Sequence, residues 1–206
     1  MKNADYWISG FREFFHSLEE TLPVVLDGAA CREGWLHGEA LRFFRSRPGT
    51  HFHVNRQPIG ERKKADFAAY ASDDDDAALW TVAELKVLGI EGFQEKVLGE
   101  AVAPLFKRLQ NGKRPLALNL DPASAPSGWG LIQDYHRLRS SSSAKPLTKL
   151  LILVLHTRSK KPDRLGQVLQ AVDFGVPAFK LHRRGTKDFT AKAWLIGDSP
   201  QMEAAR

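Results

Sequence analysis

The sequence predicts an α/β protein in which helices cover both sides of a mixed central β-sheet. Apolar residues recur at helical spacing over two N-terminal segments, and short extended stretches follow them. The run LTKLLILVLH, residues 147–156, is almost continuously apolar, as expected of a strand covered on both faces. These three observations place helices first and a buried strand at the centre of the sheet.

The length of 206 residues and the hydrophobic content of 43% suffice for one domain with a real core, expected over residues 1–206. The single Cys31 excludes an internal disulfide and a thiolate zinc site, so a reducing cytoplasm is the expected location. Asp5 and Arg12 interrupt the apolar N-terminal residues, which is not typical of a signal peptide. No stretch approaches the roughly 20 apolar residues of a membrane span, so a soluble protein is expected.

Two helices are expected before the sheet. The first, a packing helix over residues 3–22, is closed by Pro23, and the second runs from 32 to 47. Glu39 falls between Trp35 and Phe43 in the apolar stripe of the second helix, where a carboxylate is costly unless it has a partner. We therefore expect Glu39 to have a functional role. Three other acids compete for that role: Glu19, Glu20 and Glu33.

Three extended stretches follow and are expected to form an antiparallel meander: residues 51–56, 64–71 and 79–88. The four aspartates at 73–76 turn the last hairpin and are interpreted as a solvated tip rather than a metal cluster. His51 and His53 point away from Phe52 and are interpreted as surface or core-edge residues.

The second half of the chain completes the fold. Helices are expected at 92–103, continuing past Pro104 to about Gly112, and at 163–172, and closing strands at 178–182 and 191–196. Residues 121–146 are rich in Pro, Gly and Ser and are expected to form a flexible loop or insertion.

Two acids and a lysine are expected to converge on the last two strands of the meander. Alternation puts Glu84 and Lys86 on one face, and the hairpin brings Asp66 beside them. The carboxylates suit Mg²⁺, while the lysine can orient or help deprotonate an attacking water and offset phosphate charge. The constellation therefore favours phosphodiester hydrolysis.

Asp66 followed by Glu84-Leu85-Lys86 on the next strand resembles the PD-(D/E)XK nuclease superfamily, although Ala65 stands where the motif has proline. The resemblance covers about residues 32–110 and implies a restriction-endonuclease-like core of αβββαβ order. It also implies further catalytic roles for Glu39 and for Gln94. The metal ligands implied are Asp66, Glu84, Glu39 and the backbone carbonyl of Leu85, binding Mg²⁺ or Mn²⁺ in its place.

An isolated E-x-K pattern carries little weight, because acids and lysines lie together on the solvent faces of many proteins. Here Val82, Ala83 and Val87 are apolar neighbours, so the pair is expected in a largely buried strand. A purely structural cluster of Asp66, Glu84 and Lys86 remains the alternative.

The charge is uneven and points to a polyanion. The net charge is +6, but residues 1–100 hold 12 Lys/Arg against 17 Asp/Glu, whereas residues 101–206 hold 18 against 7. A basic excess of this size is also compatible with a merely solubilising surface. The candidate phosphate contacts are Arg62, Lys63, Lys64, Lys107, Arg108, Lys113 and Arg114.

The expected function is a Mg²⁺-dependent nuclease, an endonuclease acting on DNA rather than RNA by resemblance. Two alternatives remain open: an inactive nucleic-acid-binding module of the same fold, and a basic module that binds an acidic protein. The sequence also leaves open a homodimer, an immunity or accessory partner, and a role in restriction, repair, defence or toxicity.

Overall fold

The computed structural model describes residues 2–28, 32–56, 64–74, 77–88, 103–113, 130–141, 146–156, 174–183 and 189–197. The described helices are α1 (Ala4–Ser17), α2 (Leu22–Asp27), α3 (Arg32–Arg45), α5 (Ala103–Gln110) and α6 (Leu131–Ser140). The described strands are β1 (His51–Arg56), β2 (Ala65–Tyr70), β3 (Leu79–Leu88), β4 (Thr148–His156), β5 (Phe179–Arg183) and β6 (Phe189–Leu195).

The six described strands form one mixed sheet in the order β1-β2-β3-β4-β6-β5. The pairs β1/β2 and β2/β3 are antiparallel, β3 and β4 are parallel, and the last two pairs are antiparallel. The apolar run of β4 is buried between β3 and β6, so the predicted central strand is confirmed. The predicted antiparallel meander of β1, β2 and β3 is also confirmed.

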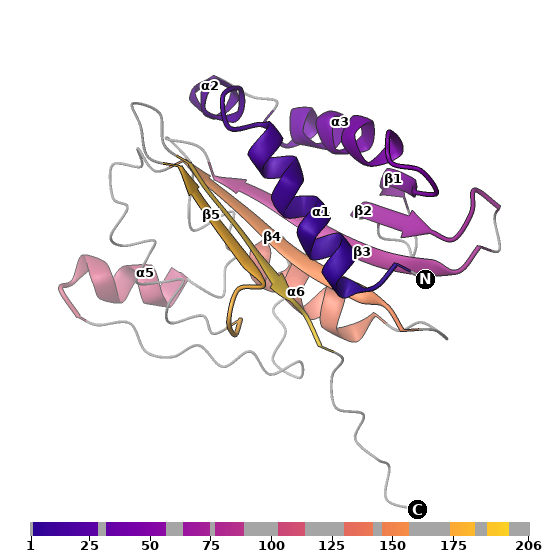
Figure 1. Cartoon of the computed structure of the whole chain (residues 1–206). Coiled ribbons are helices and arrows are strands. Elements are labelled where there is room, and N and C mark those ends of the chain that lie inside the picture. The colour runs from indigo at the N-terminus through magenta and orange to yellow at the C-terminus, as the bar shows by residue number, and fades with distance from the viewer. Residues whose placement is uncertain are drawn as a thin grey trace, which may run out of the picture.

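Helices α1 and α3 cover one face of the sheet (Figure 1). Phe11 and Phe44 pack with ring centroids 4.8 Å apart, and Phe67 of β2 lies 5.6 Å from Phe11. The same core includes Ala83 and Leu85 of β3. Because strand side chains alternate, Glu84 and Lys86 belong to the opposite face, as the sequence predicts.

Helix α6 packs against β3 and β4 on that opposite face. Its buried residues include Leu131, Ile132 and Leu138. An aromatic chain ties the helix to the sheet: Tyr135 lies 5.2 Å from Phe174, and Phe174 lies 5.3 Å from Trp194 of β6. The structure is therefore an α/β sandwich in which α6 is fixed against the strand that carries Glu84 and Lys86.

Two predicted segments are wrong. The expected helix over residues 3–22 ends at Ser17, and Pro23 lies in the first turn of α2, where proline is well tolerated. The expected loop at 121–146 contains α6, whose apolar residues pack against the sheet. The helices expected at 92–103 and 163–172 lie almost wholly outside the described residues.

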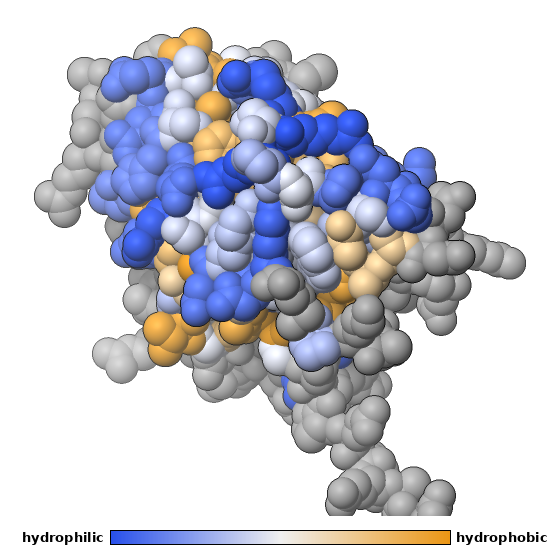
Figure 2. Space-filling model, turned by 45° about the vertical axis from the view of Figure 1, so that its right-hand side comes forward, coloured by the Kyte–Doolittle hydropathy of each residue, from blue (hydrophilic) through white to orange (hydrophobic). Residues whose placement is uncertain are grey.

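Most of the described surface is hydrophilic on the face in Figure 2, where hydrophobic residues form smaller separate areas. Large hydrophobic side chains exposed within the described ranges are Val24, Val176 and Leu195. No described helix has the length and apolar character needed to cross a bilayer.

Candidate active site

The site begins where the regular pairing of β2 with β3 ends. That pairing runs from Tyr70/Leu79 to Phe67/Ala83. Beyond it, the backbone N–H of Leu85 donates to Asp66 Oδ2 at 2.7 Å. A carboxylate thus accepts a β3 hydrogen bond at this position, and this bond fixes Asp66 between the two strands.

Helix α3 brings Glu33 and His37 to Asp66. These residues are four positions apart, so they lie on the same face of the helix. His37 Nε2 lies 3.6 Å from Asp66 Oδ1, and the imidazole packs edge-on against Phe67 with centroids 5.3 Å apart. The other ring nitrogen, Nδ1, lies 3.4 Å from the side-chain amide of Asn55 in β1.

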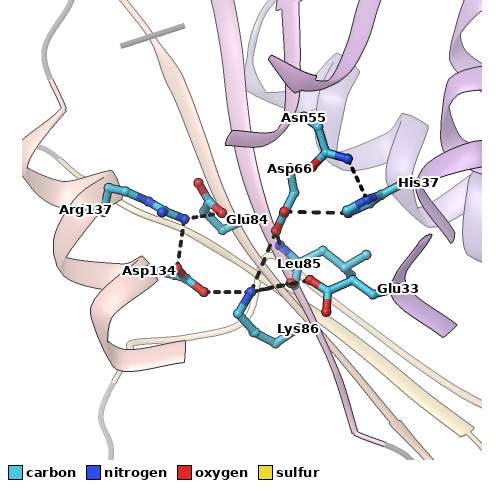
Figure 3. Close-up of polar contacts among 9 residues, drawn as sticks. All are labelled: Glu33, His37, Asn55, Asp66, Glu84, Leu85, Lys86, Asp134 and Arg137. Carbon is cyan, nitrogen blue, oxygen red and sulfur yellow. Dashed lines mark hydrogen bonds and ion pairs between the residues drawn. The ribbon is translucent and has the colours of Figure 1, made fainter. Parts of the chain in front are cut away.

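Helix α6 brings Asp134 and Arg137 to the same centre from the opposite side, as Figure 3 shows. The guanidinium of Arg137 donates to Asp134 Oδ1 at 2.8 Å and forms an ion pair with Glu84 Oε2. Glu84 is only 1% exposed, and its second oxygen, Oε1, has no hydrogen-bond partner among the described residues. Glu84 therefore pairs with Arg137 of α6 and not with the α3 side of the site, where His37 lies beside Asp66.

The ammonium group of Lys86 joins the two sides of the site (Figure 3). Lys86 Nζ lies 3.1 Å from Asp134 Oδ2, 3.5 Å from Glu33 Oε1 and 3.9 Å from Asp66 Oδ2. It also donates to the carbonyl oxygen of Leu85 at 3.1 Å. One cation from β3 thus contacts acids from α3, β2 and α6.

Burial dominates the protonation of the acids. It raises the pKa of Glu33 and of Asp134 above their ordinary values, although Lys86 acts in the other direction. Burial, with the neighbouring Asp66 and Asp134 carboxylates, raises the pKa of Glu84 to about 9. A buried carboxyl with a raised pKa is a feature of functional sites, where desolvation and charge are combined.

The two basic groups shift in opposite directions. Burial works to lower the pKa of Lys86, but Asp134, Asp66 and Glu33 outweigh it and raise that pKa well above its ordinary value. Burial lowers the pKa of His37, and the nearby Lys86 acts in the same direction, although Asp66 opposes both. Lys86 is thus a cation and His37 a neutral imidazole near pH 7.

Glu33, His37 and Asp66 together have the ligand atoms for a divalent cation. One ligand atom from each residue lies within 4.8 Å of the other two. His37 Nε2 is buried and has no hydrogen-bond partner among the described residues. A nitrogen and carboxylate oxygens this close together match the ligand types of a protein metal site.

The structure brings together Asp66, Glu84, Leu85 and Lys86, but not Glu39. Glu39 accepts from Arg42 Nη2 at 2.6 Å on the surface of α3, and its side chain is 25% exposed. The assignment of Glu39 to the site is corrected: the acid that α3 supplies is Glu33. The buried line of this helix is Leu36, Ala40 and Phe44, and Glu39 lies at its edge, where a carboxylate reaches water.

The remaining predicted residues do not contact this centre or lie outside the described ranges. Lys64 is exposed just before β2, and Lys107 and Lys113 are exposed on and after α5, where Arg108 is partly buried. Outside the described residues lie Gln94, Arg62, Lys63 and Arg114.

Sequence reasoning missed His37 and Asp134, and it indicated Arg137 only as a basic residue that could contact phosphate, not as the partner of Glu84. Each had a signal, because Asp134 lies between Leu131 and Leu138 at helical spacing and Arg137 follows it by three residues. His37 follows Glu33 by four residues. The Ser-rich and Pro-rich flanks of residues 131–140 hid the first of these patterns.

A separate cluster lies at the other end of the meander. His51 Nδ1 lies 2.9 Å from Asp73 Oδ2, and His53 Nε2 lies 3.4 Å from Asp73 Oδ1. His51 pairing lowers the pKa of the exposed Asp73. The hairpin acid thus pairs with the two β1 histidines, and these residues do not contact Lys86.

Comparison of the chain with protein-family models, with curated proteins and with solved structures finds no match. Functional inference therefore depends on the sequence motif and on the geometry of the site.

Proposed function

We propose that this protein is a metal-dependent nuclease with a restriction-endonuclease-like core, and that it hydrolyses phosphodiester bonds in DNA rather than RNA. The observation that carries the proposal is the position of Lys86, whose ammonium contacts Asp66 and Glu33 where β2 and β3 separate. An order of helix, three strands and a parallel fourth strand supports the core, as does the resemblance of Asp66 and Glu84-Leu85-Lys86 to the superfamily motif.

The carboxylates of Asp66 and Glu33 would hold a divalent cation, for which Mg²⁺ and Mn²⁺ are the candidates. Such an ion stabilises charge on a phosphate and lowers the pKa of bound water. The fit rests on the closeness of these acids and on the unpartnered His37 nitrogen beside them. Glu84 contacts Arg137 instead and is not assigned to the cation.

Lys86 supplies a fixed positive charge. Because acids raise its pKa, the ammonium keeps its proton at neutral pH, so it orients water and offsets phosphate charge rather than acting as a base. Asp134, 3.1 Å from Lys86 Nζ, holds the ammonium in place, and Arg137 contacts the carboxyl groups of both Glu84 and Asp134.

A second candidate is a nucleic-acid-binding module of the same fold without catalysis. One observation favours it: Glu84 and Asp134 already contact Arg137 and Lys86, so the carboxyl groups on the α6 side of the site have side-chain partners without a metal ion. A basic protein-interaction module remains a third reading, and it predicts salt-sensitive binding without metal dependence.

The test is cleavage of supercoiled plasmid in Mg²⁺, Mn²⁺ or EDTA by the wild type, Asp66→Asn, Lys86→Met and a control at an exposed strand lysine, Lys180→Met. We expect metal-dependent nicking that both site substitutions abolish and Lys180→Met retains, with circular dichroism checking the fold of each protein. A wild type that binds DNA but cuts neither plasmid, single-stranded DNA nor RNA would establish the binding module. A wild type that neither cuts nor binds would refute both.

A further inference from the structure

Beyond the nuclease assignment, we infer that Glu33, His37 and Asp66 form a site for a first-row transition-metal dication, with His37 as a direct ligand and Mn²⁺ bound more tightly than Mg²⁺. The inference extends the proposed function, since it names the metal class of the same site. Metal binding itself does not depend on that function.

His37 is buried beside Asp66. The residue is 8% exposed, and its Nε2 is buried, without a hydrogen-bond partner among the described residues, and turned toward Asp66. The separation of 3.6 Å from Asp66 Oδ1 is too long for a hydrogen bond. A buried polar atom without a partner is costly, and a shared cation between this nitrogen and the carboxylate removes that cost.

The three residues offer a metal ion one imidazole nitrogen and two carboxylates. Mg²⁺ prefers oxygen ligands in a strict octahedral geometry and dehydrates reluctantly, whereas imidazole suits the first-row transition metals. One nitrogen and two carboxylates, with ligand atoms within 4.8 Å of one another, therefore favour Mn²⁺ over Mg²⁺. The oxygen-only set expected from the sequence carries no such preference for a transition metal.

Asn55 contacts the second nitrogen of the His37 imidazole. The amide of Asn55 lies 3.4 Å from His37 Nδ1. In the structure, the amide nitrogen Nδ2 of Asn55 faces Nδ1 and donates to it; metal binding at Nε2 needs the other tautomer, in which the Asn55 amide is turned over and its oxygen accepts from Nδ1–H. Asn55 holds a left-handed backbone conformation within β1, with φ of 51°, which asparagine tolerates better than most residues.

The substitutions follow from these contacts. His37→Gln removes the imidazole while filling much of its space, and His16→Gln is the matched control because His16 is an exposed histidine on α1. Asn55→Gly removes the amide and accommodates the positive φ, so it tests the support of the ring without backbone strain.

The experiment is calorimetric titration of the full chain with Mn²⁺ and with Mg²⁺, together with pulsed electron paramagnetic resonance of the Mn²⁺-loaded protein. We expect tighter binding of Mn²⁺ and a histidine-nitrogen coupling to the bound ion. His37→Gln should abolish the coupling and weaken Mn²⁺ binding by at least about tenfold, and Asn55→Gly should weaken it by about tenfold. His16→Gln should match the wild type.

Three results would overturn the inference: equal affinities for the two ions, no nitrogen coupling in the wild type, or unchanged Mn²⁺ binding and coupling in His37→Gln. A protein that shows His37-dependent Mn²⁺ binding but leaves plasmid intact would retain the metal site and lose the nuclease assignment. If His37→Gln cuts plasmid with Mg²⁺ as well as with Mn²⁺, the nuclease assignment would be retained and the metal-site inference would be lost.

Discussion

Lys86 Nζ lies 3.1 Å from Asp134 Oδ2, which joins the motif strand β3 to helix α6 across the second face of the sheet. Asp134 also accepts from Arg137, the partner of Glu84. One helical turn of α6 therefore contacts both charged residues of the E-x-K pattern. This relationship makes α6 part of the site, and its substitutions should affect the chemistry as well as the stability.

Replacing Asp134 by asparagine should slow cleavage without weakening DNA binding. The amide keeps the shape of the side chain but removes the anion that holds Lys86, so the ammonium loses its position. We expect the single-turnover rate to fall by about tenfold or more, with the dissociation constant for DNA unchanged. Asp74→Asn, at an exposed acid after β2, is the control. An equal loss of rate and of binding would assign Asp134 a general structural role.

The free energy of unfolding of the metal-free protein should fall as the pH rises, because folding buries the carboxyl group of Glu84. The pKa of this group rises on folding from its ordinary 4.5 to about 9. The protonated carboxyl therefore contributes stability that is fully present below pH 4.5 and is lost as the pH rises toward 9. Glu84→Gln has no titrating group at this position. Its free energy of unfolding should therefore rise relative to that of the wild type by at most about 1.4 kcal/mol per pH unit over that range.

Urea unfolding in EDTA between pH 5 and pH 9 measures this difference. Glu39→Gln is the matched control, because Glu39 belongs to a surface pair with Arg42 and its loss should cost no more than about 1 kcal/mol at any pH. If the difference between Glu84→Gln and the wild type stays flat with pH, the carboxylate of Glu84 is ionised throughout and Arg137 outweighs burial.

The exposed lysines on and after α5 should contribute to DNA affinity through charge alone. Lys107 and Lys113 are exposed, and we expect them to contact phosphate, which carries no sequence information. Replacing either by methionine should weaken binding to unrelated DNA duplexes uniformly and reduce the slope of log K against log salt by about 1. Salt titrations by fluorescence anisotropy measure the slope. An unchanged slope in both variants would remove α5 from the DNA-binding surface.

The strands could be predicted because a buried strand has a characteristic sequence, either a continuous apolar run or an alternation of apolar and polar residues. The apolar run of β4 and the turn residues between β1, β2 and β3 reflect local chemistry, so β3 and the shared face of Glu84 and Lys86 followed from alternation. The α6 contribution was harder to see. Helical spacing in residues 131–140 indicates the helix, but Asp134 and Arg137 are held by tertiary contacts to β3, more than 45 positions away in the chain, and the local spacing does not show which strand the helix contacts.

Glu39 and Glu33 differ in how they lie relative to the buried line of α3, and an error of one residue position is enough to misplace a charge. Glu39 lies on the line of Trp35 and Phe43, which is only partly buried, whereas the core line runs through Leu36 and Ala40. The side chain at the edge of an apolar stripe reaches solvent and finds Arg42. A one-residue difference on a helix is 100°, so the stripe must be centred on its most buried line before a carboxylate is assigned to it.

The two acids of α3 give the sharpest comparison of the sequence-based and structure-based sites. Glu33 lies 3.5 Å from Lys86 and shares a candidate metal site with Asp66, whereas Glu39 contacts Arg42. Glu33→Gln should therefore lower the cleavage rate by about tenfold or more, while Glu39→Gln should leave it within about twofold of the wild type. Both substitutions replace one glutamate of the same helix by glutamine, so the two variants have the same composition and the same formal net charge. Equal rates for the two variants would remove Glu33 from the site, and a selective loss in Glu39→Gln would restore the assignment made from the sequence.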